Sequence, residues 1–241
     1  MIDLHCHILP ALDDGALDLA DSLAMARVAE RDGIEVVCAT PHIRDDHDVR
    51  IDELPARIGE LRAELELRGV RVGIAQGAEV AQASADALSQ RHLRELSLGG
   101  GGWILLEPAP GPLADGLGGV LERLHARGAR TIIAHPERHA GADFEERLRM
   151  LAERGSLIQW TADFLARAGA ADPDALVLRL AREGLVHLLA SDAHSSHGGR
   201  PVALRSAFER LAEVCPAERV AWIAERAPAA ILAGDPLSPP W

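Results

Sequence analysis

The sequence repeats one unit along most of its length: a short apolar run, a polar loop, an amphipathic stretch and a glycine. One or two residues separate the glycine from the next apolar run at Gly33, Gly69, Gly128, Gly155 and Gly184. Glycine commonly ends a helix at such a position. Strands that alternate strictly with helices form parallel sheets, because each helix returns the chain to the same end of the sheet. The repeat therefore predicts an α/β fold.

Seven strands are expected from the apolar runs. The runs are short, rich in Val, Ile and Leu, and lack clean alternation, which is typical of strands buried on both faces. The expected strands are Ile2–His7, Glu35–Thr40, Arg71–Ala75, Trp103–Glu107, Thr131–His135, Leu157–Thr161 and Val186–Ser191.

Helical periodicity marks the segments between these strands. Asp143 and Glu146 are spaced as a capping box, and Asp172-Pro173 is spaced as a helix start with proline in the first turn. Two closing helices are expected after the last strand, at Pro201–Val214 and Glu218–Arg226.

Side chains that can bind metals end six of the seven strands. His5 and His7 share one face of the first strand, because residues i and i+2 project to the same side. The remaining candidates follow the carboxyl ends of the later strands or, for Asp14, the first loop: Asp14, His42, Glu79, Glu107, His135, Asp192 and His194. A closed or nearly closed barrel gathers such ends into one mouth, whereas an open sheet spreads them along a crevice. We therefore expect a single domain over residues 1–241, a seven-stranded parallel TIM-like β/α barrel with its active site at the C-terminal ends of the strands.

Each candidate taken alone is readily explained as a solvated loop charge or a hydrogen-bonded core histidine. Nine of them on one face favour a metal site, and nine oxygen and nitrogen ligands exceed what one or two ions need. Three ions that share bridging carboxylates fit the count, and a set without thiolates suits Mn²⁺, Fe²⁺ or Zn²⁺. Clustered ions acidify a bridging water and clamp the oxygens of a phosphoryl group.

Composition narrows the partners and the compartment. The formal net charge of −12 disfavours nucleic acid as a partner. No apolar stretch has membrane-spanning length and no N-terminal signal is recognisable, so neither membrane insertion nor secretion is expected. Cys6, Cys38 and Cys215 form no CxxC pair, which suits a reducing cytoplasm.

Two arginines flank the ligand candidates: Arg138 follows His135 by three residues, and Arg200 follows His194 by six. A planar guanidinium beside a multi-metal centre is suited to bidentate phosphate binding. Chance placement is the alternative, because the chain contains no lysine and arginine alone fills that role.

A second phosphatase chemistry is suggested by Cys38 and Arg44, which have the Cys-x5-Arg spacing of cysteine-dependent phosphatases. In those enzymes small residues and glycines let successive backbone amides face the phosphate. Here the intervening residues include Pro41 and His42 but no glycine, and Cys38 lies in an expected buried strand. A thiolate nucleophile is therefore not expected.

The motifs together are collinear from Met1 to about Pro201. They read Ile-Asp-Leu-His5-Cys-His7, Leu-Asp-Asp14-Gly, Ala-Thr-Pro-His42, Gly-Ala-Glu79, Leu-Glu107, Ala-His135-Pro-Glu-Arg138, Ala-Ser-Asp192-Ala-His194 and Gly-Arg200-Pro. This set resembles the PHP (polymerase and histidinol phosphatase) superfamily, and more closely the capsule and exopolysaccharide tyrosine-protein phosphatases of the CpsB/YwqE type.

The resemblance implies a distorted seven-stranded barrel and a trinuclear, usually manganese-dependent phosphatase. Three groups of ligands are implied: His5, His7, Glu79 and Asp192 for one ion, Glu79, Glu107 and His135 for the second, and Asp14, His42 and His194 for the third. Arg138 and Arg200 fall on the catalytic, phosphate-binding arginines. The chain departs from the family pattern at Trp160, after Gln159, and in the acidic loop after His42, and both departures leave the substrate open.

The expected function is a metal-dependent protein-tyrosine phosphatase that uses a metal-bridging hydroxide. Its expected substrate is the phosphotyrosine tail of a bacterial tyrosine kinase that controls capsular or exopolysaccharide synthesis in the cytoplasm. A small-molecule phosphomonoesterase of the histidinol phosphatase kind is the alternative. A nuclease is disfavoured because no basic strip with stacking aromatics is present, and a metal-binding module without turnover is disfavoured by the complete ligand set.

Overall fold

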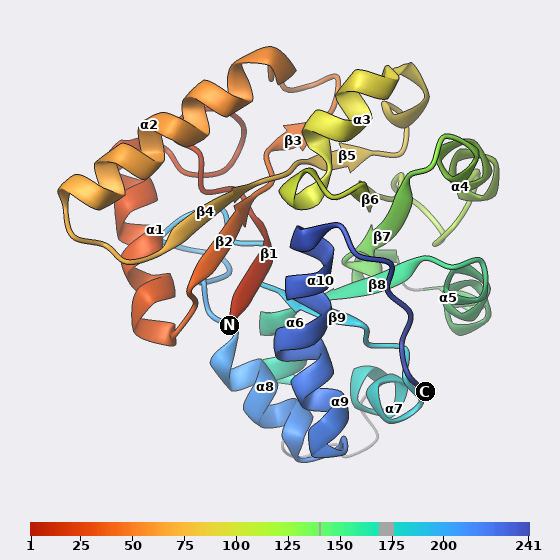
Figure 1. The fold of residues 1–241 in the computed structure, drawn as a ribbon. Helices are drawn as coiled ribbons and strands as arrows, with labels where there is room; N and C mark the ends of the chain where they lie inside the picture. Colours follow the sequence, from red (N-terminus) through yellow and green to blue (C-terminus); the bar gives the residue numbers. More distant parts are fainter. Residues whose placement is uncertain (140, 169–175) are drawn as a thin grey trace.

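Parallel strands lie at the centre of the molecule and helices surround them (Figure 1). The computed structural model describes residues 1–139, 141–168 and 176–241. One sheet has the order β1 (Ile2–Cys6), β2 (Val36–Ala39), β4 (Gly73–Gln76). The other has the order β3 (His42–Ile43), β5 (Glu79–Ala81), β6 (Trp103–Glu107), β7 (Arg130–Ala134), β8 (Leu157–Thr161), β9 (Leu188–Ala190).

All seven expected strands are present, and the second and third are each longer than expected and broken in two. After β2 the chain passes Pro41 and resumes as β3, and after β4 it passes Gly77 and resumes as β5. Proline has no N–H to donate to a ladder, so it interrupts pairing at this point. At Gly77, just after β4, an added Cβ would lie 2.7 Å from Sγ of Cys38 on β2, so a larger residue would push β4 away from β2.

The α/β class and the parallel pairing are confirmed, but the strands hydrogen-bond as two sheets rather than as one closed ring. A single parallel bridge joins Cys6, at the end of β1, to Ala193, just after β9. Backbone hydrogen bonds support it: Asp192 N–H donates to the His5 carbonyl at 2.8 Å, and His7 N–H donates to the Ala193 carbonyl at 2.9 Å. The first and last strands of the chain are therefore neighbours at their carboxyl ends.

The helices connect successive strands and cover the outside of the sheets (Figure 1). They are α1 (Leu19–Asp32), α2 (Leu54–Leu67), α3 (Gln90–Leu96), α4 (Leu117–Ala126), α5 (Phe144–Glu153), α6 (Ala162–Arg167), α7 (Leu176–Arg182), α8 (Arg205–Ala212), α9 (Ala217–Ala221) and α10 (Ala227–Ala233). In β6, between these layers, Ile104, Leu105 and Leu106 are all buried, as expected for a strand covered on both faces.

The expected helix ends are confirmed, since all five glycines at these positions have φ between 66° and 88°. Residues other than glycine rarely adopt such backbone angles.

Two other expectations, the capping box at Asp143 and the length of the second closing helix, were wrong. Asp143 precedes α5, but its side chain accepts a hydrogen bond from Arg147 Nε at 2.6 Å and caps no backbone N–H, so no capping box forms. The second closing helix is longer than expected, because α9 continues through a π-helical turn at Trp222–Arg226 into α10. The expected helix start at Asp172-Pro173 lies outside the described residues. Within the described ranges, we find no helix with the length and apolar character needed to cross a bilayer.

Candidate metal centre

The carboxyl end of β1 supplies two histidines that converge. Nε2 of His5 and Nε2 of His7 lie 3.2 Å apart, and both side chains are fully buried. The spacing of two residues on an extended chain had predicted this arrangement. Gln159 Oε1 on β8 accepts a hydrogen bond from His5 Nδ1 at 2.9 Å and so fixes the orientation of that ring.

The loop after β1 folds back over His7. Ala16 N–H donates to the His7 carbonyl at 2.9 Å, and a Cβ at Gly15 would lie 2.3 Å from that same oxygen. Glycine is therefore required for the loop to approach so closely. The consequence is that both carboxylates of the Asp13-Asp14 pair reach the site.

Asp13 and Asp14 have different contacts in that site. Asp13 Oδ2 lies 2.8 Å from His7 Nδ1 and accepts the backbone N–H of His42 at 2.9 Å. Asp14 Oδ1 lies 3.4 Å from Nε2 of His42 and 3.4 Å from Nε2 of His194. Asp14 thus lies among the candidate ligands, whereas Asp13 orients His7 and the start of β3.

Glu79 is the residue on which most of the site converges. It begins β5, is fully buried, and lies against four imidazoles. Its Oε1 is 2.7 Å from His135 Nε2, and its Oε2 is 3.0 Å from His42 Nδ1. The same Oε2 lies 3.3 Å from His5 Nε2 and 3.4 Å from His7 Nε2. A carboxylate in this position can bridge two cations.

Two site residues have strained backbones. His135 has a φ of 30° and Asp192 a φ of 50°, in the left-handed region that non-glycine residues seldom occupy. Such strain persists when the surroundings hold it, and it clusters at functional sites. At Asp192 it directs Oδ1 to 3.4 Å from His5 Nε2.

The candidate ligands form four overlapping groups, in each of which the ligand atoms lie within 4.8 Å of one another. They are His7, Asp14, His42 and His194; His5, His7 and Asp192; His5, Glu79 and His135; and His42, Glu79 and Glu107. The structure brings all nine sequence-predicted ligands into these groups. These four groups differ from the three implied ones, since Glu107 and His135 join Glu79 in separate groups. In addition, Glu79 is not grouped with His7 and Asp192, and His7 also joins the group of Asp14.

Several buried atoms of the site have no hydrogen-bond partner within the part of the chain that the structure describes. They include Glu79 Oε2, Asp192 Oδ1 and His42 Nδ1. An uncompensated buried carboxylate is costly, and such groups are normally paired or bound to a metal. Glu79 Oε2 lies 3.0 Å from His42 Nδ1, and both unpaired carboxylate oxygens lie within 3.4 Å of His5 Nε2, so the donor set fits a cluster of divalent ions.

The pKa values of His7 and His194 are shifted in opposite directions. Burial alone would lower the pKa of His7, but hydrogen bonds to Asp13 and Glu79 raise it to about 10. In His194, burial and the neighbouring His7 instead lower the pKa to about 4. The carboxylates thus hold positive charge on the inner histidines, and a metal ion that binds there must displace protons.

Both predicted arginines reach the edge of this cluster. Arg138 forms an ion pair with Oδ2 of Asp192. Arg200 Nη2 lies 3.1 Å from the same carboxylate oxygen, and Arg200 Nε donates to the Asp192 carbonyl at 2.7 Å. The two guanidinium groups are therefore adjacent to one candidate ligand, and both remain partly exposed.

Sequence reasoning missed one further arginine as a member of the site. Arg44 Nη1 lies 3.3 Å from Glu107 Oε2, and Arg44 Nε donates to Asp46 at 2.6 Å. Arg44 follows His42 by two residues, so the rule that paired His5 with His7 could have found it. Its neighbour Asp46 neutralises it at the rim.

The alternative phosphatase chemistry at Cys38 is not assembled. The Cys38 thiol is buried and donates to the Gln76 carbonyl at 3.0 Å. Burial raises its pKa far above the ordinary value, and Arg44 is directed to Glu107 instead of the thiol. A thiol in this state is a poor nucleophile.

Residues 1–233 match the family model for capsular polysaccharide synthesis, CpsB/CapC. The chain belongs to the CpsB/CapC family. It is 37% identical to the tyrosine-protein phosphatase YwqE of Bacillus subtilis over 203 residues, which is 81% of this chain and 78% of YwqE. It is 26% identical to the tyrosine-protein phosphatase CpsB of Streptococcus pneumoniae, over 88% of this chain and 90% of CpsB.

Solved structures agree with the family assignment. The crystal structures of YwqE from Bacillus subtilis and CpsB from Streptococcus pneumoniae, reported as unique metal-dependent tyrosine phosphatases, include a chain that aligns with a TM-score of 0.85. That alignment has 30% identity and covers 99% of this chain and 96% of the other. A β-aspartyl dipeptidase from Fervidobacterium islandicum aligns with a TM-score of 0.55 at 15% identity, a likeness of fold alone.

We predict that chelation destabilises the protein. Removing cations by EDTA and dialysis leaves the buried carboxylates without their strongest partners. Ligand binding at one hundred times Kd contributes about 2.7 kcal/mol, so the melting temperature should fall by roughly 5–10 °C and recover with Mn²⁺. Differential scanning calorimetry measures this shift, and Asp192→Asn should respond less than the wild type. Identical melting temperatures with and without EDTA would mean that no ion binds at the cluster.

Proposed function

We propose that this CpsB/CapC-family chain is a metal-dependent protein-tyrosine phosphatase. The observation that carries the proposal is the buried group of histidines and carboxylates around Glu79, with Arg138 and Arg200 at its edge. The relatives named as tyrosine-protein phosphatases cover most of the chain, and the aligned solved structure is described as metal-dependent. The reaction is hydrolysis of a phosphoric monoester.

We propose three divalent ions per chain, with Mn²⁺ as the resident metal and Fe²⁺ or Zn²⁺ as substitutes. The ligands would be His5, His7, Asp14, His42, Glu79, Glu107, His135, Asp192 and His194. Glu79 belongs to two of the four groups, and its two oxygens lie 2.7 Å and 3.0 Å from imidazole nitrogens of two different histidines, which supports a bridging role. When bound, such ions supply a nucleophile from water near neutral pH and neutralise charge on phosphoryl oxygens.

The protein's own residues position the substrate. Arg138 and Arg200 lie beside Asp192 on the open side of the cluster, where the planar guanidinium groups can bind phosphoryl oxygens in a bidentate manner. Asp13 and Gln159 hold the rings of His7 and His5, so that these ligands do not reorient during turnover.

Further proposals concern architecture and context. We propose that residues 1–241 are one PHP domain and that the two sheets together are a distorted seven-stranded barrel. The bridge from Cys6 to Ala193 supports this, because it joins the first strand to the last. We also propose that the substrate is the phosphotyrosine tail of a kinase in capsular or exopolysaccharide synthesis. Three free cysteines support a cytoplasmic location.

The proposed function predicts a clear preference for phosphotyrosine. Phenolate is a better leaving group than an alkoxide, since the pKa of tyrosine is about 10, so the reaction needs no strong general acid. The Mn²⁺-loaded protein should hydrolyse a phosphotyrosine peptide with a higher kcat/KM than a phosphoserine peptide or histidinol phosphate. Equal or faster turnover of either of the other two substrates would overturn the tyrosine-phosphatase proposal and favour a general phosphoesterase.

We predict that Arg138 and Arg200 are needed for turnover but not for metal binding. Arg138→Ala should retain its metal ions and lose roughly 10²–10³ in kcat, as expected when one donor to a transition state is removed. Metal analysis and steady-state kinetics on the same samples provide the test. Arg123→Ala is the control, because Arg123 pairs with Asp86 on the surface, and it should match the wild type. If Arg138→Ala and Arg200→Ala both kept wild-type kinetics, these side chains would have no part in phosphate binding.

A further inference from the structure

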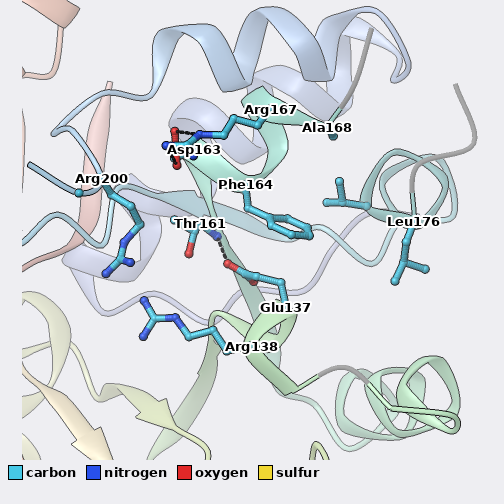
Figure 2. A pocket seen from close by; sticks show the side chains of 11 residues that line it. Glu137, Arg138, Thr161, Asp163, Phe164, Arg167, Ala168, Leu176 and Arg200 are labelled. Carbon is cyan, nitrogen blue, oxygen red and sulfur yellow. Dashed lines mark hydrogen bonds and ion pairs between the residues drawn. The ribbon is translucent and has the colours of Figure 1, made fainter. Parts of the chain in front are cut away.

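A pocket of about 600 Å³ opens beside the metal centre and has two chemically different sides (Figure 2). Arg138 and Arg200 lie on one side, and Phe164 and Leu176 lie on the other. Thr161, at the end of β8, lines the wall between them. The charged side meets the metal centre through Asp192, with which both arginines form ion pairs.

The apolar side of the pocket exposes two large hydrophobic side chains to solvent. Phe164 is 42% exposed and Leu176 36% exposed, among the few large hydrophobic side chains so exposed in the described part of the chain. Both line this one pocket. Exposed apolar side chains that gather in a concave site commonly mark a binding surface.

Phe164 is held in place from behind. Its ring stacks on the buried Trp160 with centroids 6.0 Å apart and an interplanar angle of 26°, and Trp160 in turn meets Phe144 edge to face. Trp160 is also fixed by a hydrogen bond from its Nε1 to the Leu185 carbonyl at 3.0 Å. Phe164 is therefore a preorganised aromatic surface that projects into the pocket (Figure 2).

We propose that this pocket receives the aromatic ring of phosphotyrosine and that Phe164 is a residue that determines specificity for it. The inference rests on the proposed function and names the part of the substrate that the pocket would recognise. A phosphotyrosine side chain carries its dianionic phosphate at one end of an aromatic ring. That pattern is complementary to a pocket with two guanidinium groups on one side and a phenyl ring on the other.

Glu137 forms part of the pocket wall and accepts the Thr161 N–H at 3.0 Å through Oε1, which fixes the wall between the two sides. Phosphoserine has no ring to place against Phe164.

A second cavity of about 590 Å³ on the other side of Arg138 is less suited to the ring. Its lining includes Pro108, Pro110 and His139, and it shares Arg138 with the first pocket, while its other arginine, Arg44, is paired with Asp46 and Glu107. None of the large exposed hydrophobic side chains of the described residues lines this second cavity.

The test compares two phosphonates that resist hydrolysis, phenylphosphonate and methylphosphonate, bound to the Mn²⁺-loaded full chain by isothermal titration calorimetry. Phe164→Ala should weaken phenylphosphonate by about ten-fold, the size expected for loss of an aromatic contact and its buried area. It should change methylphosphonate by less than about two-fold. Phe164→Tyr, which keeps the ring, should bind phenylphosphonate as the wild type does. Leu67→Ala, at a 77% exposed side chain on α2, should change neither affinity.

The pocket assignment is overturned if Phe164→Ala leaves phenylphosphonate affinity unchanged or weakens both phosphonates equally. Circular dichroism and metal content check that the variant is intact, and Leu176→Ala provides the same comparison if it is not. The experiment distinguishes failure of the ring pocket from failure of the proposed tyrosine-phosphatase function. Wild-type protein that binds phenylphosphonate through Phe164 but does not hydrolyse phosphotyrosine peptides would overturn the proposed function and leave the ring pocket in place.

Discussion

The burial of the Glu79 carboxylate is the constraint on which the rest of the site depends. A fully buried carboxylate is stable only when positive charge or hydrogen-bond donors surround it. In this fold the surrounding groups are imidazoles from β1, from β3 and from the end of β7, within 2.7 to 3.4 Å. Imidazoles satisfy a carboxylate either as protonated cations or as neutral co-ligands of a metal ion. The raised pKa of His7 and the unpaired atoms of Glu79 and Asp192 indicate that this buried site favours positive charge.

The fold meets this constraint by breaking two strands at the point where their side chains must turn inward. The chain resumes after Pro41 and after Gly77, and His42 then pairs directly with Glu79 in the parallel ladder between β3 and β5. One strand further along, Ala81 pairs with Glu107, and Ala81 is two residues after Glu79, so the carboxylates of Glu79 and Glu107 lie on the same face of the sheet. On the far side, the strained backbones of His135 and Asp192 direct their side chains to the same centre. The strand breaks and the positive φ values thus direct side chains from several strands to one centre.

Much of the site could be predicted from sequence because it follows local rules. Residues two apart on a strand face the same way, which predicted the convergence of His5 and His7, and glycine predicted the helix ends. Features that depend on contacts between residues far apart in the sequence could not be predicted. Asp13 orients His7 whereas its neighbour Asp14 is the candidate ligand, because Gly15 folds the loop onto the His7 carbonyl. Likewise, the grouping of Glu107 with His42 rather than with His135 depends on how far each side chain extends from neighbouring strands.

The division into two sheets was also beyond sequence reasoning, because the strands on either side of Pro41 and Gly77 are continuous in direction but not in hydrogen bonding. Trp160 is a similar case. Its position after Gln159 suggested only that the substrate was open, whereas in the structure it supports Phe164 at the wall of the pocket. In the proposed ring pocket, buried Trp160 would therefore act on substrate choice through Phe164, the neighbour that it positions.

The most direct test is the number of metal ions bound by the fully active protein. Inductively coupled plasma mass spectrometry on the same preparation used for kinetics gives the ratio of metal to chain, for the wild type and for Glu79→Gln. The account predicts three ions per chain in the wild type and a lower ratio, with loss of turnover, when the shared carboxylate is removed. Full activity with one ion or none would contradict it.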